Sequence, residues 1–409
     1  MKVCIHRGSR QIGGSCIEIA HDGARIALDF GLPLEGDPAD KTLLPPIRVD
    51  GLEAIAISHP HLDHYGLLHH LRQDVPVAMG QAARRIVRAA APFTGQALPR
   101  LEGLTLAHRT PLDIGPFRIT PYLMDHSAYD AYALQVEAGG KTLFYSGDLR
   151  GHGRKGGLFE QIVSAPPTGI DVSLMEGSSL SRLEDDDVFP SEAELEEAFV
   201  RQFRTTAGLS MVLTSAQNID RVVSLYRACK RSGRTLVIDL YAAAILEATG
   251  NRNIPQSDWP GIALFVPESQ RTQIRKNEWF ELLRRHAKRR VFPEQLRALA
   301  STSTVLFRPL MMADLERADA LQDAGFIHSQ WQGYLARGAY ATTQAWLARH
   351  RISMHHIHTS GHASPRDLRR FAEALAPGAL VPIHSFAPDK YAGLFANVMQ
   401  HPDGEWWEV

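Results

Sequence analysis

Short apolar runs rich in β-forming residues, separated by glycine and proline, fill the first 180 residues of the chain. Runs of this kind are typical of β-strands. The predicted strands are Cys16–Ala20, Ala24–Phe30, Glu53–Ser58, Phe117–Leu123, Ala131–Glu137 and Lys141–Ser146. Two segments between them, Gly66–Leu71 and Gln81–Ala91, have the composition of helices. The first part of the chain is therefore predicted to be a mixed α/β unit.

The pattern changes near Glu184–Glu197, where an acidic run leads into a predicted helix. Ser191 and Glu194 have the spacing of a capping box at its start. From Leu209 to about Gly325, strands and helices alternate as in a parallel sheet covered by helices. The predicted strands are Met211–Thr214, Thr235–Leu240, Ile262–Val266 and Thr304–Phe307, and the predicted helices are Ile219–Lys230 and Ala242–Thr249.

The last segment resembles the first part again. It holds a predicted strand at Ile352–His358, a helix that begins at Pro365 and a strand at Leu380–Ile383 that ends in His384. The simplest architecture is one α/β domain interrupted by a second. We expect residues 1–190 and 346–409 to form the first domain and residues 191–345 to form the insertion.

Composition limits the classes of protein. The chain has 409 residues, 44% hydrophobic and 22% charged, which suits a globular protein with a sizeable core. Its 44 Lys and Arg nearly balance its 45 Asp and Glu, so a nucleic-acid partner would have to be held by a local patch. Three cysteines cannot build a disulfide framework, and neither a secretory signal nor a run of ~18 apolar residues is present. We expect a cytoplasmic protein without a membrane segment.

Histidine is the exception, because the chain has 19 and they cluster. The densest group lies in Ser58–His64, directly after a predicted strand, and contains His59, His61, Asp63 and His64. Imidazole nitrogens and carboxylate oxygens are ligands that Zn²⁺ accepts. His59 and His61 can reach one metal ion while Asp63 and His64, on a first helical turn, reach a second. The alternative, a polar loop with surface histidines, gives no reason for such a concentration.

Three further residues of ligand type follow predicted strands in the same way. His126 follows the strand that ends near Met124, Asp148 follows Ser146 and Gly147, and His384 follows Ile383. Taken singly, a carboxylate at a strand end usually caps a turn and a lone histidine is usually structural. Together with the His59 cluster they predict a site for two metal ions.

The order of these motifs resembles the metallo-β-lactamase fold, an αββα sandwich. Three later segments resemble motifs of its β-CASP subgroup: Leu174–Ser178 with Glu176, Thr359–Ala363 with His362, and Pro382–His384. The segment from Ser215 to Gly233 resembles the start of the β-CASP insertion. The resemblance covers almost the whole chain and is strongest to ribonuclease J and related ribonucleases.

This resemblance implies specific roles. One metal ion would be bound by His59, His61, His126 and Asp148, and the other by Asp63, His64, Asp148 and His384, so that Asp148 bridges the two. Asp29 would order the ligand loop, and Glu176 would orient an imidazole, His64 or a neighbour. His362, with Ser360, would face the phosphate of the substrate. The expected catalytic set is Asp29, Asp63, Glu176 and His362.

The chemistry that follows is phosphodiester hydrolysis. Two cations about 3.5–4 Å apart share a hydroxide, since metal binding lowers the pKa of water to about 7. The leading hypothesis is a nuclease that uses two divalent ions, Zn²⁺ or Mn²⁺, on single-stranded RNA or else DNA. A lactonase or thioesterase on the same fold, and a catalytically silent nucleic-acid-binding subunit, are the alternatives. The sequence leaves open whether the protein is a monomer or a homodimer.

A basic stretch in the insertion offers a place for nucleic acid. Residues Arg271–Arg290 contain eight Lys or Arg and two Glu. Such a patch binds phosphates irrespective of sequence, and Trp279 or Phe280 offers a stacking face. The alternative is an amphipathic surface helix with Trp279, Phe280, Leu282 and Leu283 turned inward.

Overall fold

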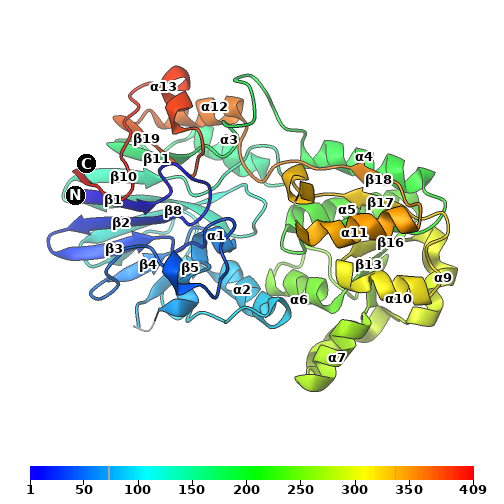
Figure 1. Cartoon of the computed structure of the whole chain (residues 1–409). Helices are drawn as coiled ribbons and strands as arrows, with labels where there is room; N and C mark the ends of the chain where they lie inside the picture. Colours follow the sequence, from blue (N-terminus) through cyan, green and yellow to red (C-terminus); the bar gives the residue numbers. More distant parts are fainter. Residues whose placement is uncertain (72–73, 337) are drawn as a thin grey trace. The chain divides into compact units, whose positions relative to one another are not determined.

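The chain leaves its first folded unit after Phe189 and returns to it at Gly361 (Figure 1). The computed structural model describes residues 1–71, 74–336 and 338–409. One unit comprises residues 1–189 and 361–409, and the other comprises residues 190–360. The return therefore lies later than the expected residue 346, because α11 (Gly338–Arg349) packs on the sheet of the second unit and β18 (Met354–His356) extends it.

Two mixed sheets form the centre of the first unit. The first sheet contains, in spatial order, β20 (Trp406–Glu408), β1 (Lys2–Arg7), β2 (Cys16–His21), β3 (Ala24–Leu28), β4 (Ala54–Ala56), β5 (Val77–Gly80) and β6 (Thr105–Leu106). The second contains β19 (Ala379–Ile383), β11 (Val172–Glu176), β10 (Lys141–Tyr145), β9 (Ala131–Ala138), β8 (Phe117–Met124) and β7 (Leu112–Ile114). Each sheet combines parallel and antiparallel pairs.

The two sheets bury one apolar layer between them and carry helices on their outer faces. Ile17 and Leu28 of the first sheet pack in one cluster with Leu134 and Leu174 of the second. Outside the first sheet lies α2 (Gln81–Thr94), and outside the second lie α3 (Gly156–Ser164) and α12 (Pro365–Leu375). The arrangement is the expected αββα sandwich, so the predicted fold class is confirmed.

Local patterns missed some elements of this unit. The helix expected at Gly66–Leu71 is instead a single turn, α1 (Leu62–Tyr65), followed by a 3₁₀ turn at Leu68–His70. Strands β1 and β20 were not predicted, and they pair with each other from opposite ends of the chain. A strand of three residues, such as β20, has too little pattern of its own to be recognised.

The second unit is built on a parallel sheet of seven strands. Their spatial order is β15 (Arg290–Val291), β14 (Ile262–Phe265), β13 (Thr235–Ile238), β16 (Ser303–Phe307), β12 (Ser210–Leu213), β17 (Gly325–His328) and β18. The helices are α4 (Glu192–Thr205), α5 (Ile219–Ser232), α6 (Leu240–Ala248), α7 (Glu268–Lys276), α8 (Phe280–His286), α9 (Leu296–Leu299), α10 (Met312–Arg317) and α11. The central strands are buried along their length, which explains their continuous apolar runs. Ser191 and Glu194 make the predicted capping box at the start of α4.

The basic stretch Arg271–Arg290 is not one amphipathic helix. α7 ends at Lys276, a turn follows, and α8 begins at Phe280. The side chain of Phe280 is 51% exposed, so the expectation that it turns inward is wrong. In the described parts of the chain, we find no helix with the length and apolar character that a bilayer crossing requires.

A buried ion pair ties the start of the second unit to its sheet. The guanidinium of Arg221 contacts the carboxylate of Glu192 at 3.0 Å, and both side chains are at most 1% exposed. Arg221 also donates to the backbone oxygen of Ser329 at 3.1 Å and to that of Thr359 at 3.4 Å. One side chain thus links α5 to α4, to the end of β17 and to the last residues of the unit.

We therefore expect Arg221→Met to destabilise the protein by about 3–5 kcal/mol, because it leaves the Glu192 carboxylate buried without its cation. Urea unfolding followed by circular dichroism measures this. The control is Arg297→Met, which removes an exposed pair with Asp319 and should cost less than about 1 kcal/mol. Equal losses of unfolding free energy in the two variants would contradict the stabilising role given to the buried pair of Arg221 and Glu192.

Candidate metal centre

The candidate ligands of the first unit come from loops that follow the ends of its strands. Ser58 and His59 follow β4, His126 follows β8, and Asp148 follows β10. His384 follows β19, while Asp63 and His64 lie on α1. Gly147 makes the approach of Asp148 possible, because its φ is +54° and a Cβ there would lie 2.8 Å from the backbone oxygen of Tyr132.

These side chains form two adjacent sets of ligand type, each with its nitrogen and oxygen atoms within 4.8 Å of one another. The first set is His59, His61 and His126; the second is Asp63, His64, Asp148 and His384. Asp148 lies near both, since its Oδ2 is 3.7 Å from His59 Nε2 and 3.2 Å from His64 Nε2. The same oxygen is 3.6 Å from His384 Nε2. All seven residues expected from the sequence are therefore brought together.

Each of three imidazoles is held through one ring nitrogen. Nδ1 of His59 lies 3.0 Å from Ser58 Oγ, and Nδ1 of His384 lies 3.0 Å from Ser15 Oγ. Nδ1 of His64 donates to Asp29 Oδ2 at 2.7 Å. Fixing one nitrogen of a histidine in this way aims the other at a metal ion.

The other ring nitrogen of each of these histidines, and the carboxylate of Asp148, lack hydrogen bonds to described residues. Within the described ranges, no hydrogen-bond partner meets His59 Nε2, His64 Nε2, His384 Nε2 or either carboxylate oxygen of Asp148, and all are buried. A buried carboxylate without partners is costly unless a cation compensates it. The donor set, imidazole and carboxylate, therefore fits divalent metal ions.

Asp29 organises the ligand loop. Its carboxylate accepts hydrogen bonds from the Ser58 backbone N–H at 2.7 Å and from the Ser58 hydroxyl at 2.8 Å, besides that from His64. The Tyr145 hydroxyl donates to it as well. Asp29 and His384 have φ of +61° and +49°, a left-handed conformation that non-glycine residues adopt only where the surroundings enforce it.

Glu176 contacts a different imidazole from the one expected first. Its carboxylate lies 3.1 Å from Nδ1 of His362, whereas His64 is oriented by Asp29. Glu176 also accepts hydrogen bonds from the backbone N–H of Leu149 at 3.1 Å and of Ser178 at 3.2 Å. Glu176, His362 and Asp148 are close enough together for a third metal group. Because Glu176 is already engaged by these donors, the group is better described as a hydrogen-bonded pair beside the metal ligands.

Burial and charge act oppositely on the site. Burial lowers the pKa of His59 and His126 well below the usual value, so both are neutral. Burial would raise the pKa of Asp148, but the imidazoles of His384 and His64 hold it well below its usual range. Burial also opposes the charge on His362, but Glu176 and Asp148 raise its pKa to about 9. Burial would likewise lower the pKa of His64, but the carboxylates of Asp148 and Asp29 raise it well above its usual value. Neutral imidazoles, as at His59 and His126, and an ionised carboxylate are the forms that bind metal, so His64 would give up a proton when an ion binds.

Sequence reasoning missed a buried ion pair behind the site. Asp125, beside His126, contacts Arg150 at 3.3 Å, and neither side chain is exposed. The carboxylate of Asp125 also accepts from the Gly153 backbone N–H at 2.7 Å. The pair joins the loop of His126 to the loop of Asp148. Its only sequence signal is that each member lies one or two positions from a predicted ligand.

Ser360 is the last residue of the second unit, two positions before His362. Its expected contact with a substrate phosphate stays a prediction.

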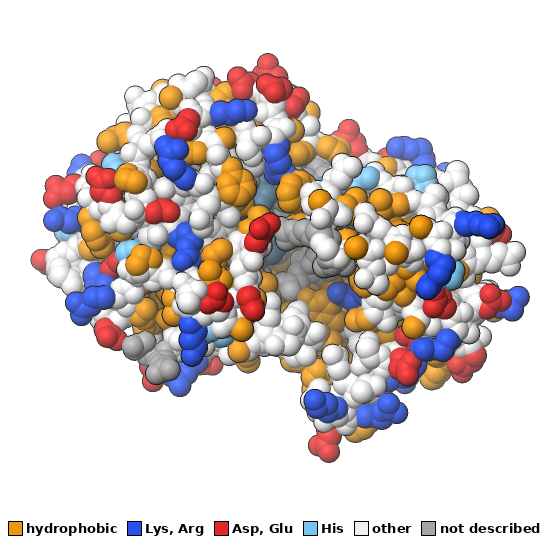
Figure 2. Space-filling model, in the orientation of Figure 1, with side chains coloured by type: hydrophobic (Ala, Val, Ile, Leu, Met, Phe, Trp, Pro, Cys, Tyr) orange, Lys and Arg blue, Asp and Glu red, His pale blue; other side chains and the backbone are white. Residues whose placement is uncertain are grey.

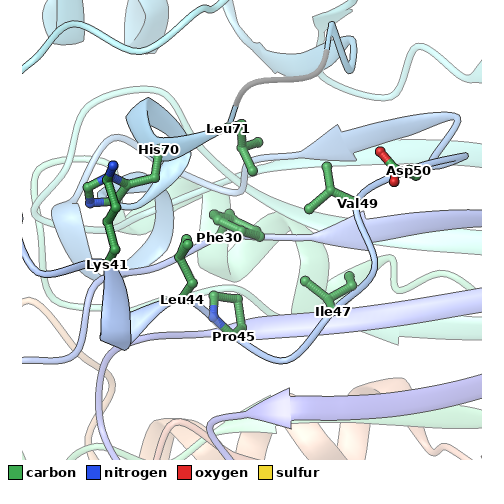
Figure 3. Close-up of a pocket in the computed structure, with 9 residues that line it drawn as sticks. All are labelled: Phe30, Lys41, Leu44, Pro45, Ile47, Val49, Asp50, His70 and Leu71. Atoms are coloured by element: carbon green, nitrogen blue, oxygen red, sulfur yellow. The ribbon is translucent and has the colours of Figure 1, made fainter.

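A separate pocket of about 400 Å³ lies in the first unit (Figure 3). Its apolar lining consists of Phe30, Leu44, Pro45, Ile47, Val49 and Leu71. None of the seven candidate ligands lines it. Among the described residues, its polar lining consists of Lys41, Asp50 and His70, which is not the dense set of imidazoles and carboxylates of the metal centre.

Comparison with known proteins agrees with this geometry. Residues 26–184 match the model of the beta-lactamase superfamily domain. Ribonuclease J of Mycobacterium tuberculosis is 27% identical over 262 residues, which cover 57% of this chain and 43% of that protein. Ribonuclease J of Sinorhizobium meliloti is 22% identical over 391 residues, covering 88% of this chain and 64% of that protein. The chain thus spans less than two thirds of the length of these relatives.

Two other proteins extend the comparison. Transcription termination factor FttA of Methanothermobacter thermautotrophicus is 27% identical over 234 residues, covering 49% of this chain and 34% of that protein. A crystal structure of a protein of unknown function from Enterococcus faecalis superposes with a TM-score of 0.77 and covers 99% of both chains, at 21% identity. This likeness shows the fold of the whole chain.

Together with the αββα sandwich, the match over residues 26–184 shows a metallo-β-lactamase superfamily domain in the first unit. The ribonuclease J proteins, which belong to the β-CASP family, are homologues of this chain at modest identity, as the motifs predicted. The fold of this superfamily implies binding of divalent metal.

We expect the purified, unchelated protein to contain two divalent ions per chain, and Asp148→Asn to lose most of both, because its carboxylate lies between the two sets. Elemental analysis measures the ions, and circular dichroism should show a retained fold. The control is Asp113→Asn, which alters an exposed carboxylate paired with Arg118 and should keep both ions. Only trace metal in the wild-type protein, or full occupancy in Asp148→Asn, would refute the assignment.

Proposed function

We propose that the protein is a metal-dependent phosphodiesterase that hydrolyses single-stranded RNA, with single-stranded DNA as a second substrate. The observation that carries the proposal is the convergence of seven ligand-type side chains next to the pair of His362 and Glu176. In the described part of the chain, the buried Nε2 atoms of His59, His64 and His384 and both carboxylate oxygens of Asp148 lack hydrogen-bond partners. The names of the two ribonuclease J relatives support RNA as the substrate class.

The residues divide the work as follows. His59, His61, His126 and Asp148 would hold one ion, and Asp63, His64, Asp148 and His384 the other, with Zn²⁺ or Mn²⁺ suited to both. When bound, such ions activate water and offset negative charge on a phosphate. Asp29 accepts a hydrogen bond from Nδ1 of His64, so Nε2 would be the nitrogen that binds a metal ion.

His362 and Glu176 would act on the substrate itself. Glu176 accepts a hydrogen bond from Nδ1 of His362, so His362 would contact the phosphate or the leaving oxygen through Nε2. A positioned imidazole can then stabilise charge or give a proton to the leaving oxygen. Ser360 would contribute a hydroxyl contact to the same phosphate. No nucleophilic serine or cysteine is required.

The test of the function uses labelled substrates. The purified protein is incubated with RNA and DNA strands that are labelled at either end and carry a triphosphate, a monophosphate or a hydroxyl at the 5′ end. Lactones and thioesters are assayed in parallel. We expect RNA to be hydrolysed fastest, and the label positions report whether cleavage is internal or from one end. Turnover of lactones or thioesters alone would favour a small-molecule hydrolase. A protein that contains metal but turns over none of these substrates would favour a catalytically silent nucleic-acid-binding subunit.

His362→Ala and His384→Ala should have different consequences. His362→Ala should retain both ions and lose about 10²- to 10⁴-fold in rate, the usual contribution of positioned acid–base catalysis. His384→Ala should lose one ion, because its Nε2 faces Asp63 at 3.7 Å and Asp148 at 3.6 Å. Metal content and single-turnover rates separate the two. Loss of a metal ion from His362→Ala, or its cleavage at the wild-type rate, would show that the division of roles is wrong.

A further inference from the structure

The two helices α7 and α8 and the turn between them form a positively charged surface on the second unit, here called the basic arm (Arg271–Arg290). Buried side chains hold the basic arm in place. Ile274 of α7 is 3% exposed, and His286, at the end of α8, is 4% exposed. Nδ1 of His286 lies 2.8 Å from Ser257 Oγ. Because these anchors hold both helices, the outward residues of the arm present a defined surface.

The charges of the arm are only partly neutralised. Arg271 pairs with Asp314 at 3.4 Å, Arg284 with Glu281 at 2.7 Å, and Arg285 with Glu247 at 3.5 Å. Three other basic side chains, Arg275, Lys276 and Lys288, are exposed and make no ion pair with any described residue.

The basic arm also contains an exposed aromatic ring. Phe280 opens α8, four residues after Lys276, and its side chain is 51% exposed although the neighbouring Leu282 and Leu283 are partly covered. The turn before it is set by Glu278, whose φ is +57°. A segment that carries both an exposed aromatic ring and unpaired cations has the combination that binds single-stranded nucleic acid, since the cations contact phosphates while the ring stacks on a base.

The local charge contrasts with that of the whole chain. The arm has eight Lys or Arg and two Glu, whereas the chain as a whole has a net charge of −1. Figure 2 shows Lys and Arg side chains gathered on the part of the surface that Figure 1 labels α7. A polyanion is therefore attracted to this surface and not to the protein in general.

We propose that the basic arm is a docking surface for single-stranded RNA, in which Arg275, Lys276 and Lys288 contact phosphates and Phe280 stacks on a base. The proposal rests on the proposed function, because it gives that nuclease a substrate-holding surface on the unit that supplies none of the candidate metal ligands. RNA is favoured over an acidic protein because the exposed ring adds a contact that a base uses and a carboxylate does not.

The test measures binding of the full-length protein to an oligouridine of about 20 nucleotides with hydrolysis-resistant phosphorothioate linkages, by fluorescence anisotropy over a range of salt concentrations. The triple variant Arg275→Ala, Lys276→Ala, Lys288→Ala should bind about ten- to a hundredfold more weakly near 0.1 M salt. The slope of log affinity against log salt should fall by about 2, since each phosphate contact on a single strand contributes about 0.7. Phe280→Ala should lower the affinity about fivefold or more without changing the slope of log affinity against log salt.

The matched control is the triple variant Arg201→Ala, Lys230→Ala, Arg252→Ala, which removes the same charge from exposed positions elsewhere on the second unit. It should bind as the wild-type protein does. Inorganic polyphosphate, which has no bases, serves as a second probe: the arm triple variant should bind it more weakly, whereas Phe280→Ala should bind it normally. Hydrolysis of a uridine dinucleotide, which is too short to need a docking surface, should stay within about twofold of wild type in every arm variant.

The outcomes separate this proposal from the proposed function. Wild-type cleavage of RNA together with unchanged affinity and slope in the arm triple variant would overturn the arm alone. Equal losses in the control triple variant would overturn it too, because charge in general would then explain binding. Unchanged binding by Phe280→Ala, with weaker binding by the triple variant, would point to an acidic protein or another polyanion as the occupant instead of RNA. A wild-type protein that neither binds nor cleaves nucleic acid would overturn both proposals.

Discussion

The buried carboxylate of Asp148 is the feature on which the arrangement of the first unit depends. Among the described residues neither of its oxygens has a hydrogen-bond partner, and three histidine Nε2 atoms lie within 3.7 Å of Oδ2. A charge in this position costs several kcal/mol unless a cation compensates it. The surrounding hydrogen bonds fix the other nitrogen of each imidazole, so the site is organised around the ion that it would hold.

Elements from both ends of the chain build this site. β19 inserts beside β11 and delivers His384, while β20 pairs with β1, so the returning segment joins both sheets. The site residues follow the carboxyl ends of strands in both sheets. Beyond these ends the backbone no longer pairs with a neighbouring strand, so the loops can turn toward the site. Left-handed backbone at Asp29 and His384 shows that tertiary contacts override local preference here.

The second unit has its buried ion pair inside and its unpaired basic side chains outside. Its parallel sheet is covered by helices and stabilised by a buried pair, Arg221 and Glu192, whereas its charged groups of functional interest lie outside, on α7 and α8. A metal centre recognises a phosphate but holds little of a long polymer. Placing unpaired cations and an exposed ring on a second unit would supply the affinity that a net charge of −1 does not.

The sequence predicted the insertion from the change of pattern along the chain, and it predicted the seven candidate ligands because a dense group of imidazoles after an apolar strand has no packing explanation. The resemblance of its motif order to the metallo-β-lactamase fold added the αββα class and pointed to Asp29, Glu176 and His362. The sequence did not determine which imidazole Glu176 contacts, since His64 and His362 are separated by almost 300 positions and only folding brings one of them to that carboxylate. The pair of Asp125 and Arg150, the pairing of β1 with β20 and the outward position of Phe280 were likewise decided by tertiary structure. Each depends on contacts between distant segments or on a break between two helices, and neither leaves a periodic signal in the local sequence.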